Sequence, residues 1–258
     1  MFNQLPQVTK NILLLNIAFF VATLILNKQG IDLELSLGGH YINSPFFRPY
    51  QVVTHFFMHS STNFLHIVMN MWLFVMLGSF LEKLWGPKRF FIFYIACALG
   101  SFALYNVIGV LEIQSLRANL APKFNLEQFD YFLANSVSFN ANAAQQINDY
   151  LFSHHIELSD ALQTYIFKCY TPVVGASGAV FGILAAFAIL FPNTEFRLYF
   201  AIPVKAKYLV TGYVLLEMYL SFASNVNDNI AHLAHVGGAI VGAILVVVWR
   251  KNDRVNFY

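Results

Sequence analysis

Four polar side chains lie within strongly apolar segments of the sequence and have the chemical types needed to cleave an amide bond. Ser177 is embedded in a run of small residues, and His235 lies near the start of the last apolar segment. A serine hydroxyl hydrogen-bonded to an imidazole is the arrangement of a nucleophile and its general base. His66 and Asn70 carry N–H groups that could stabilise the oxyanion formed by attack on a carbonyl. The set predicts acyl transfer, with Ser177 as nucleophile and His235 as base.

The spacing of these residues predicts that they meet at one depth in a membrane. His66 and Asn70 are four positions apart and would share one helix face. Ser177 and Phe181 have the same spacing, so the Phe181 ring could pack on the incoming imidazole. If Ser177 and His235 lie four or five residues inside their segments, the rise of about 1.5 Å per residue puts both roughly 6–8 Å below the outer membrane surface.

Small residues beside the serine and the histidine predict close contact between their two helices. Gly175 and Gly178 flank Ser177, and Gly238 and Gly242 follow the histidine. Small residues at such spacings let membrane helices approach closely, and a hydrogen bond between hydroxyl and imidazole requires that approach.

Six apolar segments could position these residues. A membrane-spanning helix needs about 20 mostly apolar residues, and only helices or closed barrels satisfy their backbone groups in lipid. The sequence therefore predicts an all-α polytopic membrane protein. The expected spans are residues 10–27, 59–81, 89–111, 172–191, 206–223 and 231–249.

The composition supports membrane integration. Hydrophobic residues make up 58% of the chain and charged residues only 11%, against about 25% charged residues in soluble domains. The net charge of +2 gives no reason to expect a nucleic-acid partner. The apolar run from Ile12 to Leu26 is expected to be a retained helix, because no small-residue cleavage site follows it. Lipid is therefore an expected partner.

Lysine and arginine residues predict the orientation. They are more frequent at the loops and ends that contain Lys83, Arg89, Arg197 and Arg250 than at the opposite ends. Positive residues favour the cytoplasmic side, so both termini are expected to be cytoplasmic, in a bacterial inner membrane. Residues 1–258 are expected to form a single domain. Within it, residues 112–170 are an inserted outer-face loop with short amphipathic helices, either a packed insertion or a partner surface.

Four short motifs together resemble those of the rhomboid family of intramembrane serine proteases. They are Gly175-Ala176-Ser177-Gly178, Ala234-His235 with Gly238 and Gly242, His66 with Asn70, and Glu82 with Gly86. The resemblance covers roughly residues 10–111 and 171–250. It implies a six-helix bundle acting as a serine endopeptidase on transmembrane segments of other membrane proteins, without a cofactor.

No acidic residue lies in the predicted sixth helix, so a Ser–His dyad is expected. Glu217, in the predicted fifth helix, could act as a proton relay or could bond to a neighbouring helix end. His59 is expected to help keep a cleft to the outer face wet. No metal site is expected, because the His-Glu-x-x-His pattern of zinc peptidases is absent from the sequence.

Two other functions fit the same elements. A catalytically inactive rhomboid-like protein would bind membrane proteins or act in their quality control, but such relatives lose the serine or the histidine. A transporter would use the polar cluster as a binding site, but transporters of this kind usually show internal repeats, and the sequence shows none. The motifs do not predict an oligomeric state.

Overall fold

The computed structural model describes residues 5–137, 142–198, 202–223 and 232–252. The described residues are predominantly helical, and the chain is a polytopic membrane protein. Four of their helices are long and apolar enough to cross a membrane: α1 (Gln7–Asn27), the continuous helix Phe64–Trp85, α6 (Pro87–Leu120) and α12 (His232–Asn252). The second of these consists of α4 (Phe64–Leu73), a π-helical turn η3 (Phe74–Gly78) and α5 (Ser79–Trp85).

Two further helices complete the predicted bundle of six. α11 (Ala206–Ala223) coincides with the predicted fifth segment. α10 (Ser177–Leu190) has only 14 residues, so the predicted span 172–191 is too long. The reason is that the segment before Ser177 is not helical, since Val173 pairs with Gly39 and Gly175 has φ +127°. Consequently Ser177 is the first residue of its helix, not a residue five positions inside it.

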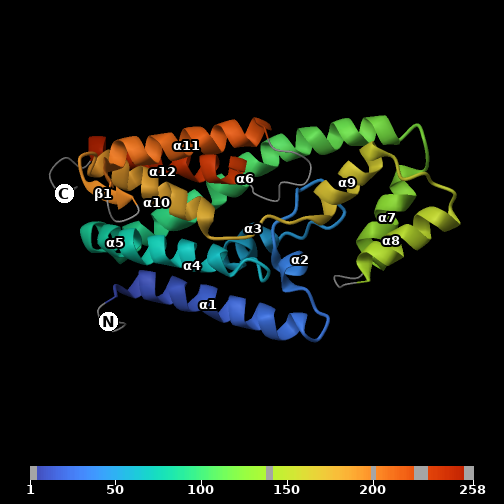
Figure 1. The fold of residues 1–258 in the computed structure, drawn as a ribbon, viewed down its shortest axis with the longest axis horizontal. Coiled ribbons are helices and arrows are strands. Elements are labelled where there is room, and N and C mark those ends of the chain that lie inside the picture. Colours follow the sequence, from blue (N-terminus) through green and yellow to red (C-terminus); the bar gives the residue numbers. More distant parts are fainter. Residues whose placement is uncertain (1–4, 138–141, 199–201, 224–231, 253–258) are drawn as a thin grey trace.

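The helices alternate in direction along the bundle (Figure 1). α10 packs most extensively on α12, and both pack on α6, while α11 lies against α12 and α10. α1 begins and α12 ends at the same end of the bundle. A short antiparallel hairpin at that end joins α10 to α11, with β1 (Glu195–Leu198) paired to β2 (Ile202–Lys205). Among the described residues, this hairpin and an isolated bridge between Gly39 and Val173 are the β pairings in an otherwise helical structure.

Glycines make the contact between α10 and α12 possible. A Cβ atom added to Gly238 would lie 1.8 Å from the carbonyl oxygen of Gly178, and one added to Gly242 would lie 2.6 Å from that of Gly182. On the other side of α10, a Cβ at Gly178 would meet the Ser101 side chain of α6. Close packing of this kind replaces the hydrophobic effect as the force between helices in lipid.

Glu82 joins α1 to the second spanning helix at the end of the bundle where α1 begins, the predicted cytoplasmic or inner end. Its carboxylate accepts hydrogen bonds from the backbone N–H groups of Val8 (2.9 Å) and Thr9 (2.7 Å) and from the Thr9 hydroxyl (2.7 Å). These amides belong to the first turn of α1, where N–H groups lack helical partners and the helix dipole favours a negative charge. Gly86, with φ +80°, then makes the sharp turn into α6.

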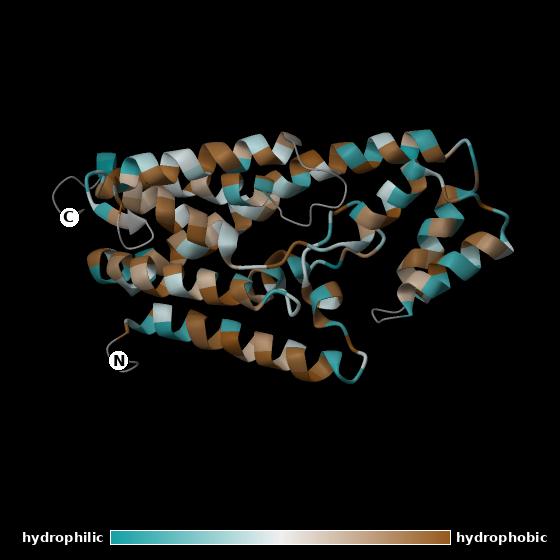
Figure 2. Ribbon diagram, viewed as in Figure 1, coloured by the Kyte–Doolittle hydropathy of each residue, from teal (hydrophilic) through white to brown (hydrophobic). Residues whose placement is uncertain are grey.

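The opposite end of the bundle, the predicted outer end, carries a separate small core. α6 continues to Leu120, beyond its predicted end at residue 111, and is followed by α7 (Leu126–Ser136), α8 (Ala143–Ser153) and α9 (Asp160–Tyr170). Polar residues are frequent along α7 and α8 (Figure 2). Their apolar faces bury Phe129, Leu133 and Ile147 with Tyr165 of α9. The predicted amphipathic helices in this segment are therefore present as a packed layer.

Polar contacts fasten this layer to the bundle. Arg117 of α6 pairs with Asp130 of α7, and the Tyr165 hydroxyl donates a 2.6 Å hydrogen bond to the same carboxylate. Lys168 of α9 pairs with Glu112 of α6 at 2.7 Å. Because α9 leads directly to the segment before Ser177, these contacts also help to fix the start of α10.

The loop between α1 and α4 contains α2 (Leu33–Leu37), α3 (Gln51–Thr54) and the 3₁₀ turn η2 (His55–Phe57). The buried Gln51 side chain is its internal anchor. The side-chain oxygen of Gln51 accepts hydrogen bonds from the backbone N–H groups of His40 and Arg48. Its side-chain NH₂ group donates to the backbone carbonyls of Ser36 and Phe46. One side chain thus joins four backbone groups of the loop.

Candidate active site

The loop between α1 and α4 positions the segment that leads to Ser177. Gly39 and Val173 exchange two backbone hydrogen bonds of 2.8 and 2.9 Å, and the Gly175 N–H donates to the His55 carbonyl at 3.0 Å. Gly175 has φ +127°, a backbone conformation that L side chains rarely adopt. This turn brings Ser177 to the first position of α10, with its side chain half-buried.

Ser177 and His235 are brought together from α10 and α12. The distance between Ser177 Oγ and His235 Nε2 is 2.8 Å, a hydrogen-bond distance. The ring of Phe181, one turn along α10, stacks on the imidazole with a centroid separation of 4.4 Å and an angle of 6°. The pairing of Phe181 with the imidazole expected from their spacing is therefore present in the structure.

A third side chain contacts His235 on the opposite ring nitrogen. Glu217 Oε2 of α11 lies 2.8 Å from His235 Nδ1 and 2.6 Å from His232 Nδ1. A dyad was expected because only the sixth helix was searched for an acid, and this contacting carboxylate comes from the fifth. Of the two roles considered for Glu217, bonding to a helix end describes the His232 contact, and His235 adds a second contact.

The other predicted residues border the serine from α4. A Cβ atom on Gly175 would lie 3.0 Å from the His66 ring and 3.5 Å from Ser177 Oγ, so His66 and Ser177 border the same small space. The Asn70 side chain is buried and donates a 3.0 Å hydrogen bond to the His66 carbonyl on its own helix. In this conformation the Asn70 amide supports α4.

His59 is fully buried beneath the outer loops. Its ring centroid lies 5.2 Å from that of His66, and neither of its ring nitrogens has a hydrogen-bond partner among the described residues. Burial lowers the pKa of His59 to about 3, so this imidazole is neutral at physiological pH. The predicted contribution of His59 to a wet cleft stays a prediction.

The start of α10 adds backbone donors to the site. The first N–H groups of an α-helix have no partner within the helix, and they carry the positive end of its dipole. Since α10 begins at Ser177, these amides lie beside the hydroxyl. A negative charge on an oxygen close to Ser177 would be stabilised by them and by an N–H group of His66.

Glu217, His232 and His235 also form a possible set of metal ligands, because one ligand atom of each lies within 4.8 Å of the others. Direct hydrogen bonds between the same atoms account for this clustering without an ion. Sequence reasoning missed the cluster, although two signals pointed to it. Glu217 is an acidic residue in an apolar segment, and His232 lies three positions before His235 on one helix.

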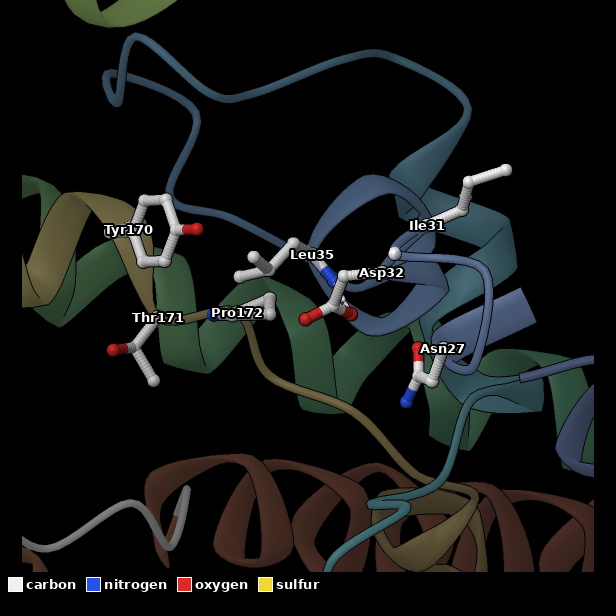
Figure 3. A pocket seen from close by; sticks show the side chains of 8 residues that line it. Asn27, Ile31, Asp32, Leu35, Tyr170, Thr171 and Pro172 are labelled. Carbon is white, nitrogen blue, oxygen red and sulfur yellow. Dashed lines mark hydrogen bonds between the residues drawn. The ribbon is translucent and has the colours of Figure 1, made fainter. Parts of the chain in front are cut away.

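A separate pocket of about 400 Å³ lies at the outer end of the bundle (Figure 3). It is bordered by Asn27 at the end of α1, by Asp32 and Leu35, by Tyr170 at the end of α9, and by Thr171 and Pro172 after it. Ser177, His235 and Glu217 do not line it. The pocket is therefore distinct from the Ser177–His235 contact, although it borders the segment that leads to Ser177.

Comparisons with known proteins agree with the sequence motifs. A model of the rhomboid domain matches residues 47–113 and 141–252, which is more than half of the chain. An uncharacterized mitochondrial rhomboid protein of Schizosaccharomyces pombe is 37% identical over 89 residues, 32% of this chain and 23% of the relative. The mitochondrial RHOMBOID-like protein 12 of Arabidopsis thaliana is 37% identical over 87 residues, 34% of this chain and 24% of the relative.

These alignments span about a quarter of the length of each curated relative. Both relatives carry the word mitochondrial in their names, which does not fit the predicted bacterial inner membrane. The family model covers both α4, with His66 and Asn70, and the segment from α10 to α12, with Ser177 and His235. On the strength of this match, the chain belongs to the rhomboid family.

Proposed function

We propose that this chain is an intramembrane serine endopeptidase that cleaves transmembrane segments of other membrane proteins. The observation that carries the proposal is the 2.8 Å contact between Ser177 Oγ and His235 Nε2, within a rhomboid domain. Family membership alone supports a hydrolase of this kind. The contact adds a nucleophile and a base at the distance that proton transfer requires.

In the proposed reaction, Ser177 Oγ attacks the scissile carbonyl carbon while its proton passes to His235 Nε2. The resulting oxyanion would be stabilised by the Ser177 backbone N–H and by the His66 ring, with Asn70 as a further donor after rotation of its side chain. His235 then gives its proton to the leaving amine, and the peptide bond breaks. Water, activated by His235, hydrolyses the ester on Ser177 and restores the hydroxyl.

The surroundings of the site support this substrate class. The apolar outer surfaces of the bundle face lipid, and exposed side chains such as Leu216 of α11 cannot hold a soluble peptide by polar contacts. A membrane-embedded segment could reach Ser177 only after local unwinding, because an intact helix hides its carbonyl groups in its own hydrogen bonds. Transmembrane proteins are therefore the proposed partners.

The proposal treats residues 1–258 as a single membrane domain. Residues 114–140 fall outside the family match, whereas 141–170 fall inside it. The part of the predicted 112–170 insertion that the family model does not match is centred on α7. We restrict the proposed location to an integral membrane site with both termini on one side, because the names of the relatives do not fit a bacterial membrane.

Co-expression with a tagged single-span substrate tests the function. Wild type should release a fragment cut within the span, and Ser177→Ala and His235→Ala should release none. A serine-reactive fluorophosphonate should label wild type but not Ser177→Ala. If Ser177→Ala cleaves and labels like wild type, Ser177 is not the nucleophile and the proposal is wrong. If wild type itself releases no fragment and is not labelled, binding of membrane proteins without cleavage is the remaining function for a rhomboid domain.

A further inference from the structure

The fifth helix directs one carboxylate towards the sixth helix. Glu217 is 4% exposed, whereas its neighbours Leu216 and Met218 are 49% and 42% exposed. Among the described residues, its Oε2 atom contacts α12 twice, at 2.6 Å to His232 Nδ1 and 2.8 Å to His235 Nδ1. A buried carboxylate is stable only when hydrogen-bond donors replace its water, and the two imidazole N–H groups supply them.

The chemistry of these atoms determines where the protons lie. An ionised carboxylate only accepts hydrogen bonds, so both Nδ1 atoms that contact Glu217 must carry a proton. A neutral imidazole with its proton on Nδ1 has a lone pair on Nε2. For His235 that lone pair faces Ser177 Oγ, 2.8 Å away, and can accept the hydroxyl proton. The opposite tautomer would leave the base without a lone pair for the serine.

We propose that Glu217 is a positioning residue that fixes the tautomer and orientation of His235, with His232 holding the carboxylate in place; this deepens the proposed peptidase function and rests on it. His232 lies one helical turn before His235 and binds the same oxygen, so rotation of the Glu217 side chain would break both contacts. When His235 takes the serine proton and becomes positively charged, the adjacent carboxylate stabilises it. The working unit is then Ser177–His235–Glu217, contributed by three helices.

The variant Glu217→Gln tests this role in the full-length, detergent-purified chain. The amide has the shape of the carboxylate but lacks its charge. We expect kcat on a tagged transmembrane substrate to fall about 10²- to 10⁴-fold, as for loss of the acid in serine-protease triads. KM should change little, and fluorophosphonate labelling of Ser177 should slow in parallel with kcat. Glu217→Asp, which keeps the charge, should retain a higher kcat than Glu217→Gln. His232→Gln should lower kcat less than Glu217→Gln does.

Glu82→Gln is the matched control. Glu82 is also a buried carboxylate in a spanning helix, but it lies at the inner end and contacts α1. The Glu82→Gln variant should have the wild-type kcat when the rate is divided by the amount of serine that the probe labels. Expressing every rate per labelled serine separates loss of chemistry from loss of folded protein.

Three results would overturn the proposal while leaving the peptidase function in place, provided that Ser177→Ala is inactive. The first is a wild-type kcat and labelling rate in Glu217→Gln. The second is a loss of activity in both Glu217 variants that is fully explained by a smaller fraction of folded protein. Glu217 would then only stabilise the packing of α11 on α12. The third is wild-type activity that a chelator abolishes and zinc restores, which would make the cluster a metal site. If Ser177→Ala is active, both proposals fail.

Discussion

The two ends of the bundle each contain a buried glutamate in a spanning helix. Glu82 at the inner end is 3% exposed and Glu217 near the outer end is 4% exposed. Glu82 bonds to backbone N–H groups and a threonine hydroxyl of α1, groups that keep their protons at any physiological pH. Glu217 bonds to two imidazoles, one of which also faces a serine hydroxyl.

The comparison shows that burial of an acid in a membrane helix does not by itself identify a catalytic group. At the inner end the hydrogen-bond partners of Glu82 do not take part in proton transfer, so Glu82 contributes only to the stability of the fold. At the outer end the partner can exchange a proton with a nucleophile, so Glu217 can contribute to a reaction. Changes at the inner end should therefore alter stability, and changes at the outer end should alter turnover.

The largest effect is expected from Gly238→Val, which would disturb the helix pair that carries both catalytic candidates. Even a Cβ atom at this position would lie 1.8 Å from the Gly178 carbonyl oxygen, so α12 must move away from α10. The hydrogen bond between Ser177 and His235 would break, and the free energy of unfolding should fall by more than about 3 kcal/mol.

The measurements are substrate cleavage and the thermal midpoint of the purified protein. Both should fall far more than in Gly212→Ala, because Gly212 of α11 has open space around it. Cleavage at the wild-type rate in Gly238→Val would show that the close approach of α10 and α12 is not needed for the site.

Glu82→Ala should give the largest loss of stability at the inner end. Three hydrogen bonds to a carboxylate are removed, and the first turn of α1 is left with unpaired N–H groups. Since hydrogen bonds to charged groups contribute about 1.5–3 kcal/mol each, and such contributions are not fully additive, we expect a loss of about 3 kcal/mol. Denaturant titration in mixed micelles measures this loss.

The smaller change Thr9→Val isolates one of these bonds, and a loss of about 1 kcal/mol is expected. In both variants kcat per labelled serine should equal that of wild type. A lower kcat per labelled serine with unchanged stability would contradict the assignment of the inner end to stability alone.

The sequence was sufficient for much of this comparison because membrane helices leave a strong local signal. The apolar runs predicted six helices, and the polar residues within them singled out Ser177, His235, His66 and Asn70. Their spacing also predicted that Phe181 would pack on His235, and the two rings are stacked. These predictions need only the composition and the period of one segment at a time.

The predictions that went wrong depended on contacts between segments. Ser177 was placed five residues inside a helix because residues 172–176 are apolar, yet Val173 pairs with Gly39 and Gly175 has φ +127°, so the helix begins only at Ser177. Glu217 was not assigned to His235 because helical spacing relates residues within one helix and cannot show which face α11 turns towards α12. Loop pairing and helix rotation are both set by tertiary packing.

Gly86→Ala sharpens the comparison through backbone conformation at the inner end. Gly86 has φ +80° and ψ 162°, a combination that is nearly restricted to glycine, and nothing lies within 4 Å of an added Cβ atom. The expected loss of stability is therefore the conformational strain alone, about 2 kcal/mol, without a change in kcat.

The equivalent change at the outer end, Gly175→Ala, adds a contact to the strain, since the Cβ atom would lie 3.0 Å from the His66 ring and 3.5 Å from Ser177 Oγ. It should lower kcat as well as stability. Equal effects of the two changes on kcat would remove the distinction between the turn beside the serine and the turn at the inner end.

The smallest effect on kcat is expected from Phe181→Leu, and it tests whether the outer end depends on ring geometry as well as on charge. Leucine keeps the position apolar but removes the stack on His235, which has a centroid separation of 4.4 Å. Aromatic pairs contribute about 0.5–1.5 kcal/mol beyond their buried area, so kcat should fall by up to about tenfold.

Trp249→Leu is the control, because Trp249 packs on Trp85 at the inner end at 5.7 Å, and it should lower the thermal midpoint but not kcat. If Phe181→Leu and Glu217→Gln are combined, the losses should multiply only when ring and carboxylate act separately on His235. A combined loss no greater than that of Glu217→Gln alone would mean that the carboxylate sets the imidazole orientation and that the ring only fills the space beside it.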